Sequence, residues 1–163
     1  MSTKKGINVK LGDVFLIPLS QGSDVGAQVI VKSDILYVAI FDRVYSSDPN
    51  PDEVVADKCS LSGWTMDGKI YHGDWKIIGA AGMSNTARYL KNYLVTYQGA
   101  SWVTDVDGNM LRPASEKDRA ALFLRSSYSP ARLERAVRAF HGLEEWSQDF
   151  DGLRNLTGTT WAN

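Results

Sequence analysis

Two stretches rich in β-branched and aromatic residues, 12–19 and 26–31, lie on either side of a polar turn. The turn, residues 20–24, contains serine, glutamine, glycine and aspartate, which favour a reversal of the chain. This pattern predicts a β-hairpin. The first stretch is almost continuously hydrophobic, as in a strand covered on both faces. Pro18 has no backbone N–H to donate, so we expect it at a sheet edge or near the end of its strand.

Residues 35–41 form the most hydrophobic run of the chain and predict a central strand. Residues 46–53 contain two prolines and three acidic side chains, so this segment is expected to be an exposed loop. Short strand-like stretches then follow one another up to about residue 112, separated by turn signals. One of these signals is Asp67-Gly68, a favoured pair for a hairpin turn.

The last third of the chain has the signals of helices. Ser115 with Asp118 forms a loose capping box and predicts a short helix after it, while Ser129-Pro130 predicts the start of a longer one. Gly142 is expected to end the longer helix, and one more short helix is expected within 144–153. The longer helix is amphipathic, with Leu133, Ala136, Val137 and Phe140 on one side and Arg132, Arg135 and Arg138 on the other.

Together these patterns predict an α+β protein. We expect a bent antiparallel sheet or partly open barrel over residues 10–112, approximately, with two or three C-terminal helices packed on one side. A chain of 163 residues is long enough to bury a core without disulfides or metals. Residues 1–163 are therefore predicted to form a single domain.

Composition and charge limit the classes of function that we expect for this protein. The formal net charge of −1 argues against a dedicated nucleic-acid-binding protein, which usually carries a basic excess. The single cysteine, Cys59, excludes an intrachain disulfide. The N-terminus lacks an apolar signal segment, and no stretch has the length of apolar residues that a membrane helix needs, so we expect a cytoplasmic location without membrane association.

No pattern of catalytic or metal-binding residues stands out. The two histidines, His72 and His141, have no zinc-like spacing to cysteine or acidic residues, so neither a metal site nor a cofactor is expected. Cys59 with either histidine is a candidate nucleophile, but a lone cysteine in a β-rich region is more typical of a buried small hydrophobe. Asp105 and Asp107 suggest a carboxylate pair, although a hairpin turn explains them more simply.

Two charged segments are candidate binding surfaces. The first is the acidic, proline-stiffened segment with Asp48, Asp52, Glu53 and Asp57, which would attract a basic partner. The second is the arginine face formed by Arg132, Arg135 and Arg138. With Tyr93, Tyr97 and Trp102 as a base-stacking platform, these arginines would suit a nucleic-acid-binding β-barrel, which is the alternative reading. A solvated connection and a solvated helix face remain the simpler accounts of the two segments.

Three segments resemble the bacterial immunity protein 26 family: residues 10–19 (KLGDVFLIPL), 26–30 (GAQVI) and 73–79 (GDWKIIG). The resemblance covers about residues 10–112. It implies a non-enzymatic cytoplasmic protein that binds and blocks a toxin domain encoded beside it. It implies no catalytic residues and no particular binding site. The leading expectation is therefore an immunity protein that neutralises a cognate toxin, with the acidic segment as its candidate interface.

Overall fold

The computed structural model describes residues 6–155; the remaining residues of the predicted 1–163 domain lie outside this range. Its main feature is a six-stranded sheet with strand order β5-β1-β2-β3-β4-β9, in which only the β4–β9 pair is parallel. The six strands are β1 (Asp13–Ser20), β2 (Ser23–Lys32), β3 (Leu36–Tyr45), β4 (Cys59–Thr65), β5 (Lys76–Ala80) and β9 (Ser127–Tyr128).

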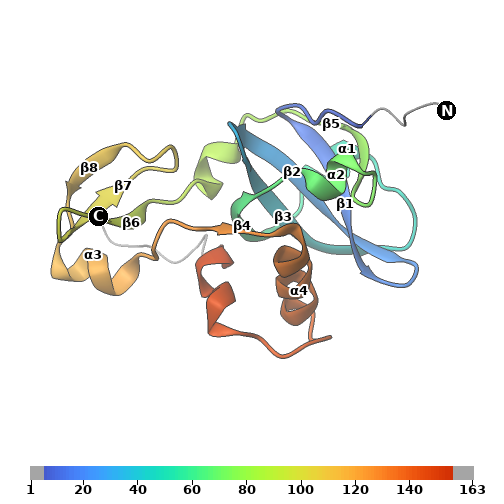
Figure 1. Cartoon of the computed structure of the whole chain (residues 1–163). Helices are drawn as coiled ribbons and strands as arrows, with labels where there is room; N and C mark the ends of the chain where they lie inside the picture. Colours follow the sequence, from blue (N-terminus) through green and yellow to red (C-terminus); the bar gives the residue numbers. More distant parts are fainter. Residues whose placement is uncertain (1–5, 156–163) are drawn as a thin grey trace.

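A second sheet with order β6-β7-β8 and several short helices complete the fold. Its strands are β6 (Tyr93–Tyr97), β7 (Ala100–Thr104) and β8 (Met110–Pro113). The helices are α1 (Pro51–Val55), α2 (Gly68–Tyr71), α3 (Glu116–Ala121) and α4 (Pro130–Phe140), with two 3-10 turns, η1 (Thr86–Tyr89) and η2 (Gln148–Leu153). In Figure 1 the smaller sheet and α3 form a lobe beside the main sheet, and α4 lies below the main sheet.

The predicted N-terminal hairpin is confirmed: β1 pairs with β2 in an antiparallel register that includes Leu16 opposite Gly26. The strand predicted to be central is also confirmed, because β3 lies between β2 and β4. Pro18 is exposed and lies beyond Leu16, the last β1 residue that pairs with β5. The missing N–H of Pro18 therefore costs no hydrogen bond to β5.

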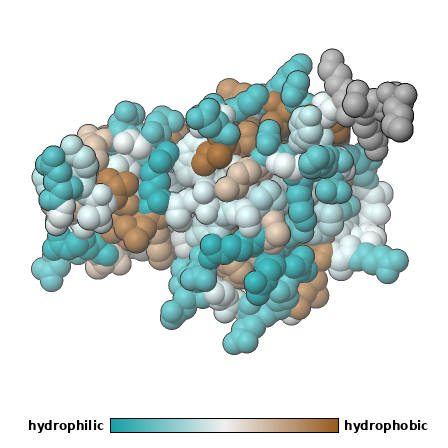
Figure 2. Space-filling view, in the orientation of Figure 1, coloured by the Kyte–Doolittle hydropathy of each residue, from teal (hydrophilic) through white to brown (hydrophobic). Residues whose placement is uncertain are grey.

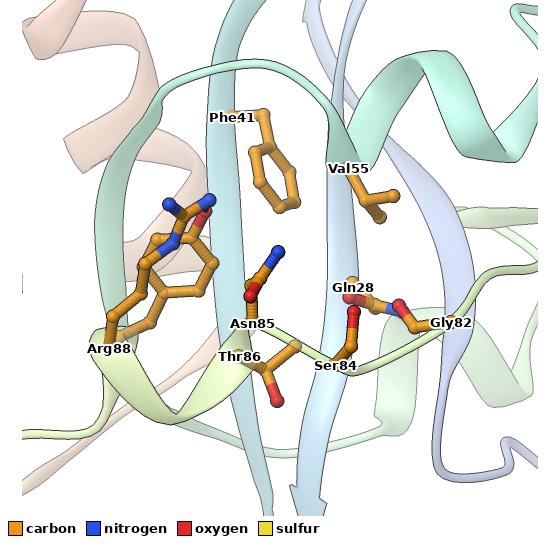
Figure 3. A pocket seen from close by; sticks show the side chains of 9 residues that line it. Gln28, Phe41, Val55, Gly82, Ser84, Asn85, Thr86 and Arg88 are labelled. Carbon is orange, nitrogen blue, oxygen red and sulfur yellow. Dashed lines mark hydrogen bonds between the residues drawn. The ribbon is translucent and has the colours of Figure 1, made fainter.

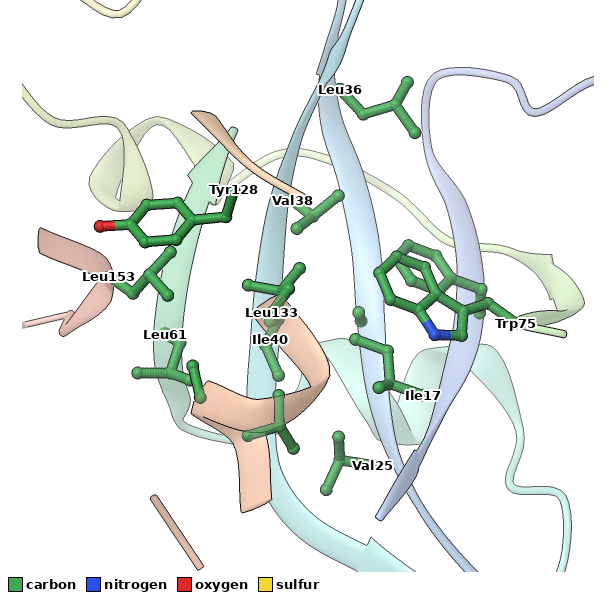
Figure 4. Packing of buried hydrophobic residues seen from close by; sticks show 14 of the residues in the cluster. Ile17, Val25, Leu36, Val38, Ile40, Leu61, Trp75, Tyr128, Leu133 and Leu153 are labelled. Carbon is green, nitrogen blue, oxygen red and sulfur yellow. The ribbon is translucent and has the colours of Figure 1, made fainter. Parts of the chain in front are cut away.

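Both faces of the main sheet are buried, which explains why its strands read as continuous hydrophobic runs. Alternate residues of β3 enter two different clusters: Leu36, Val38 and Ile40 face one layer, and Tyr37, Ala39 and Phe41 face the other. The first layer contains α4, whose Leu133 packs over the sheet in Figure 4. The second contains Val54 of α1 and Tyr89 of η1.

The C-terminal helix α4 forms as its sequence predicts. Ser129 Oγ accepts a hydrogen bond from Arg132 N, and Pro130 occupies the first turn. Gly142 has a φ of +79°, and Leu143 N donates to Arg138 O, so the helix ends in a left-handed glycine cap. Burial of Leu133, Ala136 and Val137 confirms most of the predicted apolar side of this helix. Phe140, which was predicted to lie on the same side, is exposed at the last residue of the helix.

The α+β class with an open sheet is confirmed, but three local predictions need correction. The expected single sheet is divided in two, because residues 93–113 pair only among themselves as strands. Asp67-Gly68 starts α2 instead of turning a hairpin, since β5 pairs with β1 and not with β4. The second half of the segment expected to be a loop is α1, with Asn50 as its N-cap. Among residues 6–155 no helix has the length and apolarity needed to cross a membrane.

Candidate protein-binding surface

Helix α1 sits on two glycines of the main sheet. A Cβ atom at Gly26 would lie 2.3 Å from Val54 Cγ1, and one at Gly79 would lie 2.8 Å from Pro51 Cγ. Both distances are shorter than a carbon–carbon contact allows, so only glycine lets the helix approach this closely. Asn50 Oδ1 accepts a hydrogen bond of 3.0 Å from Asp52 N and fixes the start of the helix. The sheet therefore holds α1 in one position.

The structure brings the four acidic residues of the predicted site to α1 and its two ends. Asp52 and Glu53 are exposed on the helix, and within residues 6–155 neither carboxylate forms an ion pair or hydrogen bond. Asp48 precedes the helix and pairs with Lys76 of β5. Asp57 follows it and accepts a hydrogen bond of 2.7 Å from Arg43 N. Asp52 and Glu53 are thus available to a partner, whereas Asp48 and Asp57 also stabilise the fold.

Asp24 joins this acidic surface, although the sequence analysis did not include it. Burial, and then the nearby Asp48 carboxylate, raise the pKa of Asp24, while Lys76 acts in the opposite direction. Asp24 pairs with Tyr45 in the β2–β3 register, which places it near the segment that follows β3. The proximity of Asp24 to this segment follows from the pairing of β2 with β3, which no local sequence pattern indicates. We name Asp24, Asp48, Asp52, Glu53 and Asp57 the acidic surface.

A small pocket of about 80 Å³ adjoins α1 on the same side of the sheet (Figure 3). Phe41, Val55 and Tyr89 give it apolar walls, and Asn85 and Arg88 give it polar ones. Its inner end contains Gln28 of β2, which is fully buried. The sequence signal for this site is Gln28 itself, a polar residue within an otherwise hydrophobic stretch of β2.

The amide of Gln28 has a fixed orientation. Gln28 Nε2 lies 3.2 Å from Gly12 O, 3.0 Å from Ala81 O and 3.4 Å from Gly82 O. Carbonyl oxygens only accept hydrogen bonds, so the nitrogen must face them and Oε1 must face the other way. Within residues 6–155 Oε1 has no hydrogen-bond partner. Gln28 therefore carries a buried acceptor oxygen without a donor among the described residues.

The arginine face lies on the opposite side of the main sheet from α1, because α4 packs in the other hydrophobic layer. Its three arginines are ion-paired: Arg132 with Asp149 at 3.3 Å, and both Arg135 and Arg138 with Glu144. Glu134 of the same helix accepts a hydrogen bond from the buried Trp75 indole and so does not belong to this face. The charge of the arginine face is thus largely balanced by acidic residues of the same chain.

The aromatic residues proposed for base stacking do not form one exposed platform. Tyr93 is buried in the core, where its hydroxyl lies 3.0 Å from that of Tyr37. Tyr97 is exposed and Trp102 is half-buried on the smaller sheet. With Tyr93 inaccessible, the structure offers little for the nucleic-acid reading, which required all three rings.

The residues considered for catalysis have the burial and the contacts of residues that stabilise the fold. Cys59 is buried, and burial raises the pKa of its thiol to about 11, so the reactive thiolate is disfavoured. Asp105 accepts hydrogen bonds from both Asn109 N and Asn109 Nδ2 at 2.9 Å, as expected for a turn residue. In residues 6–155 no three His, Cys, Asp or Glu side chains are grouped so that they could hold a metal ion.

A wider groove of about 420 Å³ lies between the α3–β9 connection and η2. Phe123 and Leu124 contribute exposed hydrophobic side chains to it, 44% and 65% accessible. The face drawn in Figure 2 is mostly hydrophilic, with separate brown patches, one of them on the lobe of the smaller sheet. This apolar surface was not predicted from the sequence.

Comparison with known protein families identifies a match. The model of the family described as Immunity protein 26 matches residues 10–97. These residues include α1, the residues that line the pocket, and strands β1 to β5 of the main sheet. No curated protein matches the chain, and no solved structure does. The matched segment spans more than half of the 163 residues. The chain therefore belongs to the immunity protein 26 family.

Proposed function

We propose that the protein binds and neutralises a cognate bacterial toxin in the cytoplasm, without catalysing a reaction, and that the acidic surface on α1 contacts the toxin. The observation that carries the proposal is the position of α1 within the family-matched residues. Gly26 and Gly79 lie in two of the segments that carry the family resemblance, and both make room for this helix. The same segments therefore build the support for Asp52 and Glu53.

Physical chemistry favours this surface for a basic partner. Neither Asp52 nor Glu53 is ion-paired within residues 6–155, so no ion pair between these two residues and this part of the chain has to break when a basic partner binds. Helix α1 is capped and packed against Gly26 and Gly79, so it is already ordered. Binding at this helix therefore costs little conformational entropy. Like charges gathered on one surface steer an oppositely charged partner and accelerate association.

The arginine face is a weaker candidate for two reasons. Arg132, Arg135 and Arg138 would have to exchange the carboxylates of Asp149 and Glu144 for those of a partner. All three arginines also lie outside residues 10–97, the segment that matches the family. We therefore use this face as the control surface in the experiments below.

The direct test is protection from the toxin. The candidate toxin is the product of the gene adjacent to that of this protein, and its expression alone should arrest growth. Co-expression of this protein should restore growth and yield a complex of fixed stoichiometry. The double variant Asp52→Lys/Glu53→Lys should protect less well, whereas Glu116→Lys, which reverses an acidic residue in the first turn of α3, should protect like the wild type.

Two results would contradict the proposal. One is a failure of the wild-type protein to bind or to protect against the adjacent gene product and the other toxins of the same host. The second is catalytic turnover of the toxin, or of its product, by this protein in place of a stoichiometric complex.

A further inference from the structure

The segment of residues 84–88 forms the polar side of the pocket beside α1. Asn85 directly precedes η1 and Arg88 lies three residues later, and both side chains line the pocket. Side chains three residues apart in a 3-10 turn lie on the same side of the backbone. In the view of Figure 3 the Asn85 side chain points toward Phe41, with Arg88 on one side of it and Val55 on the other. The amide and the guanidinium therefore border one space.

Arg88 is a cation without an acidic partner in the described part of the chain. Its Nη2 donates a hydrogen bond of 2.7 Å to Tyr89 Oη, and the guanidinium carbon lies 4.9 Å from the centre of the Tyr89 ring. These contacts hold the guanidinium beside the pocket and use one of its five N–H donors. Within residues 6–155 Arg88 has no ion pair, unlike the three arginines of the arginine face. Arg88 can therefore bind an anion without breaking an ion pair to this part of the chain.

The side chains next to Arg88 offer further hydrogen-bond donors. Within residues 6–155 neither the Ser84 hydroxyl nor the Asn85 amide forms a hydrogen bond. Ser84, Asn85 and Arg88 are all exposed, so a partner can reach them. None of the described residues that line the pocket is acidic, so a negative charge that enters meets no like charge in these walls. The polar side of the pocket therefore suits an anion.

The apolar walls and the size limit which anion fits. Pockets for cofactors and drug-sized ligands measure about 300–1,000 Å³, whereas this pocket of about 80 Å³ can take only the end of a side chain. A carboxylate is planar and matches the guanidinium with two parallel hydrogen bonds. The methylene groups of aspartate or glutamate suit the walls formed by Phe41 and Val55, and a free phosphate has no such groups. Phosphorylated segments are typically bound by clusters of arginines, and among the described residues one arginine lines this pocket.

We propose that this pocket receives one acidic side chain, an aspartate or a glutamate, of the partner protein, and that its carboxylate accepts hydrogen bonds from Arg88 and Asn85. This inference rests on the proposed function for the identity of the partner. Val55 lines the pocket and is the last residue of α1, which carries Asp52 and Glu53, so the pocket adjoins the acidic surface. The partner therefore presents basic residues to the acidic surface and an acidic residue to Arg88. Such alternation of charge fixes the orientation of the partner and disfavours proteins whose surface is uniformly basic.

The pocket can be tested without the toxin, with N-acetyl-aspartate N-methylamide as the probe. In a titration at low salt followed by two-dimensional NMR, this probe should produce saturable shifts of the Asn85 side-chain amide and of the Arg88 Nε–H group. The uncharged asparagine analogue and inorganic phosphate should each bind at least about ten-fold more weakly. Arg88→Gln should weaken binding of the aspartate probe about ten-fold or more, and Asn85→Ala less, because it removes a neutral donor. Arg132→Gln, on the opposite side of the main sheet, should leave binding unchanged.

Three outcomes would overturn the assignment: equal responses to the aspartate and asparagine probes, tighter binding of phosphate than of the aspartate probe, or aspartate binding that Arg88→Gln leaves unchanged.

The toxin complex separates failure of the pocket from failure of the proposed function. In this complex Arg88→Gln should raise the dissociation rate constant about ten-fold. Arg88→Lys keeps the charge but cannot form two parallel hydrogen bonds, so it should recover only part of the loss. Binding of the aspartate probe without binding of the toxin would contradict the proposed function alone. A toxin complex whose dissociation rate is unchanged by Arg88→Gln would contradict the pocket alone.

Discussion

The indole Nε1 of Trp75 donates a hydrogen bond of 2.7 Å to Glu134 Oε1 in α4. The other carboxylate oxygen of Glu134 lies 2.8 Å from Lys69 Nζ in α2. Trp75 is fully buried and lies within the family-matched residues, whereas Glu134 lies outside them. This contact therefore ties the C-terminal helix to the segment that defines the family.

Replacing Glu134 by alanine should lower the free energy of unfolding by about 1–3 kcal/mol, because the indole N–H would remain buried without an acceptor. Glu134→Gln keeps an acceptor oxygen and should cost less. Glu145→Ala, an exposed position beyond the end of α4, serves as the control. Urea unfolding measures all three. Equal stability of Glu134→Ala and Glu145→Ala would show that the contact is not structural.

The close packing of α1 on the main sheet, where Val54 lies against Gly26, can be tested with a double-mutant cycle. Gly26→Ala should lower stability by about 1–3 kcal/mol, because its Cβ would overlap the Val54 side chain. Val54→Ala should also destabilise, because it leaves a cavity. The double variant should lose less than the sum of the two, since each change relieves the other. Gly68→Ala, where a Cβ meets no atom within 4 Å, is the control; additive losses would contradict this close packing.

Lys91 should make stability depend on pH. Its Nζ donates to Ser62 O and Gly152 O, and burial lowers the pKa of the ammonium group to about 7. Between that value and the ordinary pKa near 10.5, the unfolded chain binds more protons than the folded chain. The free energy of unfolding should therefore rise between pH 7 and 9, by at most about 1.4 kcal/mol per unit.

The check is chemical unfolding at several pH values between 7 and 9, a range below the raised pKa values of Cys59 and the buried tyrosines. Lys91→Met fills the same space without a titrating group, so its stability should change less over this range. Parallel pH profiles for the wild type and Lys91→Met would assign the effect to other groups.

Cys59 should be unreactive in the folded protein. Its side chain is buried and the pKa of its thiol is raised to about 11, so a thiol reagent finds neither access nor thiolate. Labelling at pH 8 should be at least about a hundred-fold slower than in denaturant, because it requires opening of the structure. Rapid modification under native conditions would show that this part of β4 opens readily.

The parts of the fold that depend on local signals were predictable. Ser129 and Gly142 fix the ends of α4, and the hydrophobic run at 35–41 identifies β3. The hairpin predicted at Asp67-Gly68 failed because strand pairing is decided by distant residues: β4 pairs with β9 and β5 pairs with β1. No short-range sequence pattern indicates which distant strand will pair with β4 or with β5.

The candidate surface was predictable only in part. The prolines and acidic residues correctly placed Asp52 and Glu53 on the exterior. Asn50-Pro51 was a start signal for α1, but five residues are too few for a periodic pattern. The contribution of Asp24 and the orientation of Gln28 depend on neighbours far away in the sequence, so they became visible only in three dimensions.

The most direct test of the toxin-binding surface is the association rate constant with the toxin, measured by stopped flow as a function of ionic strength. For the wild type this rate should fall as salt increases. Asp52→Lys/Glu53→Lys should slow association by about ten-fold or more at low salt and change dissociation less. The arginine-face variant Arg132→Glu/Arg135→Glu should associate like the wild type. Association that is unchanged by the α1 variant and slowed by the arginine-face variant would contradict the account and place the toxin on α4.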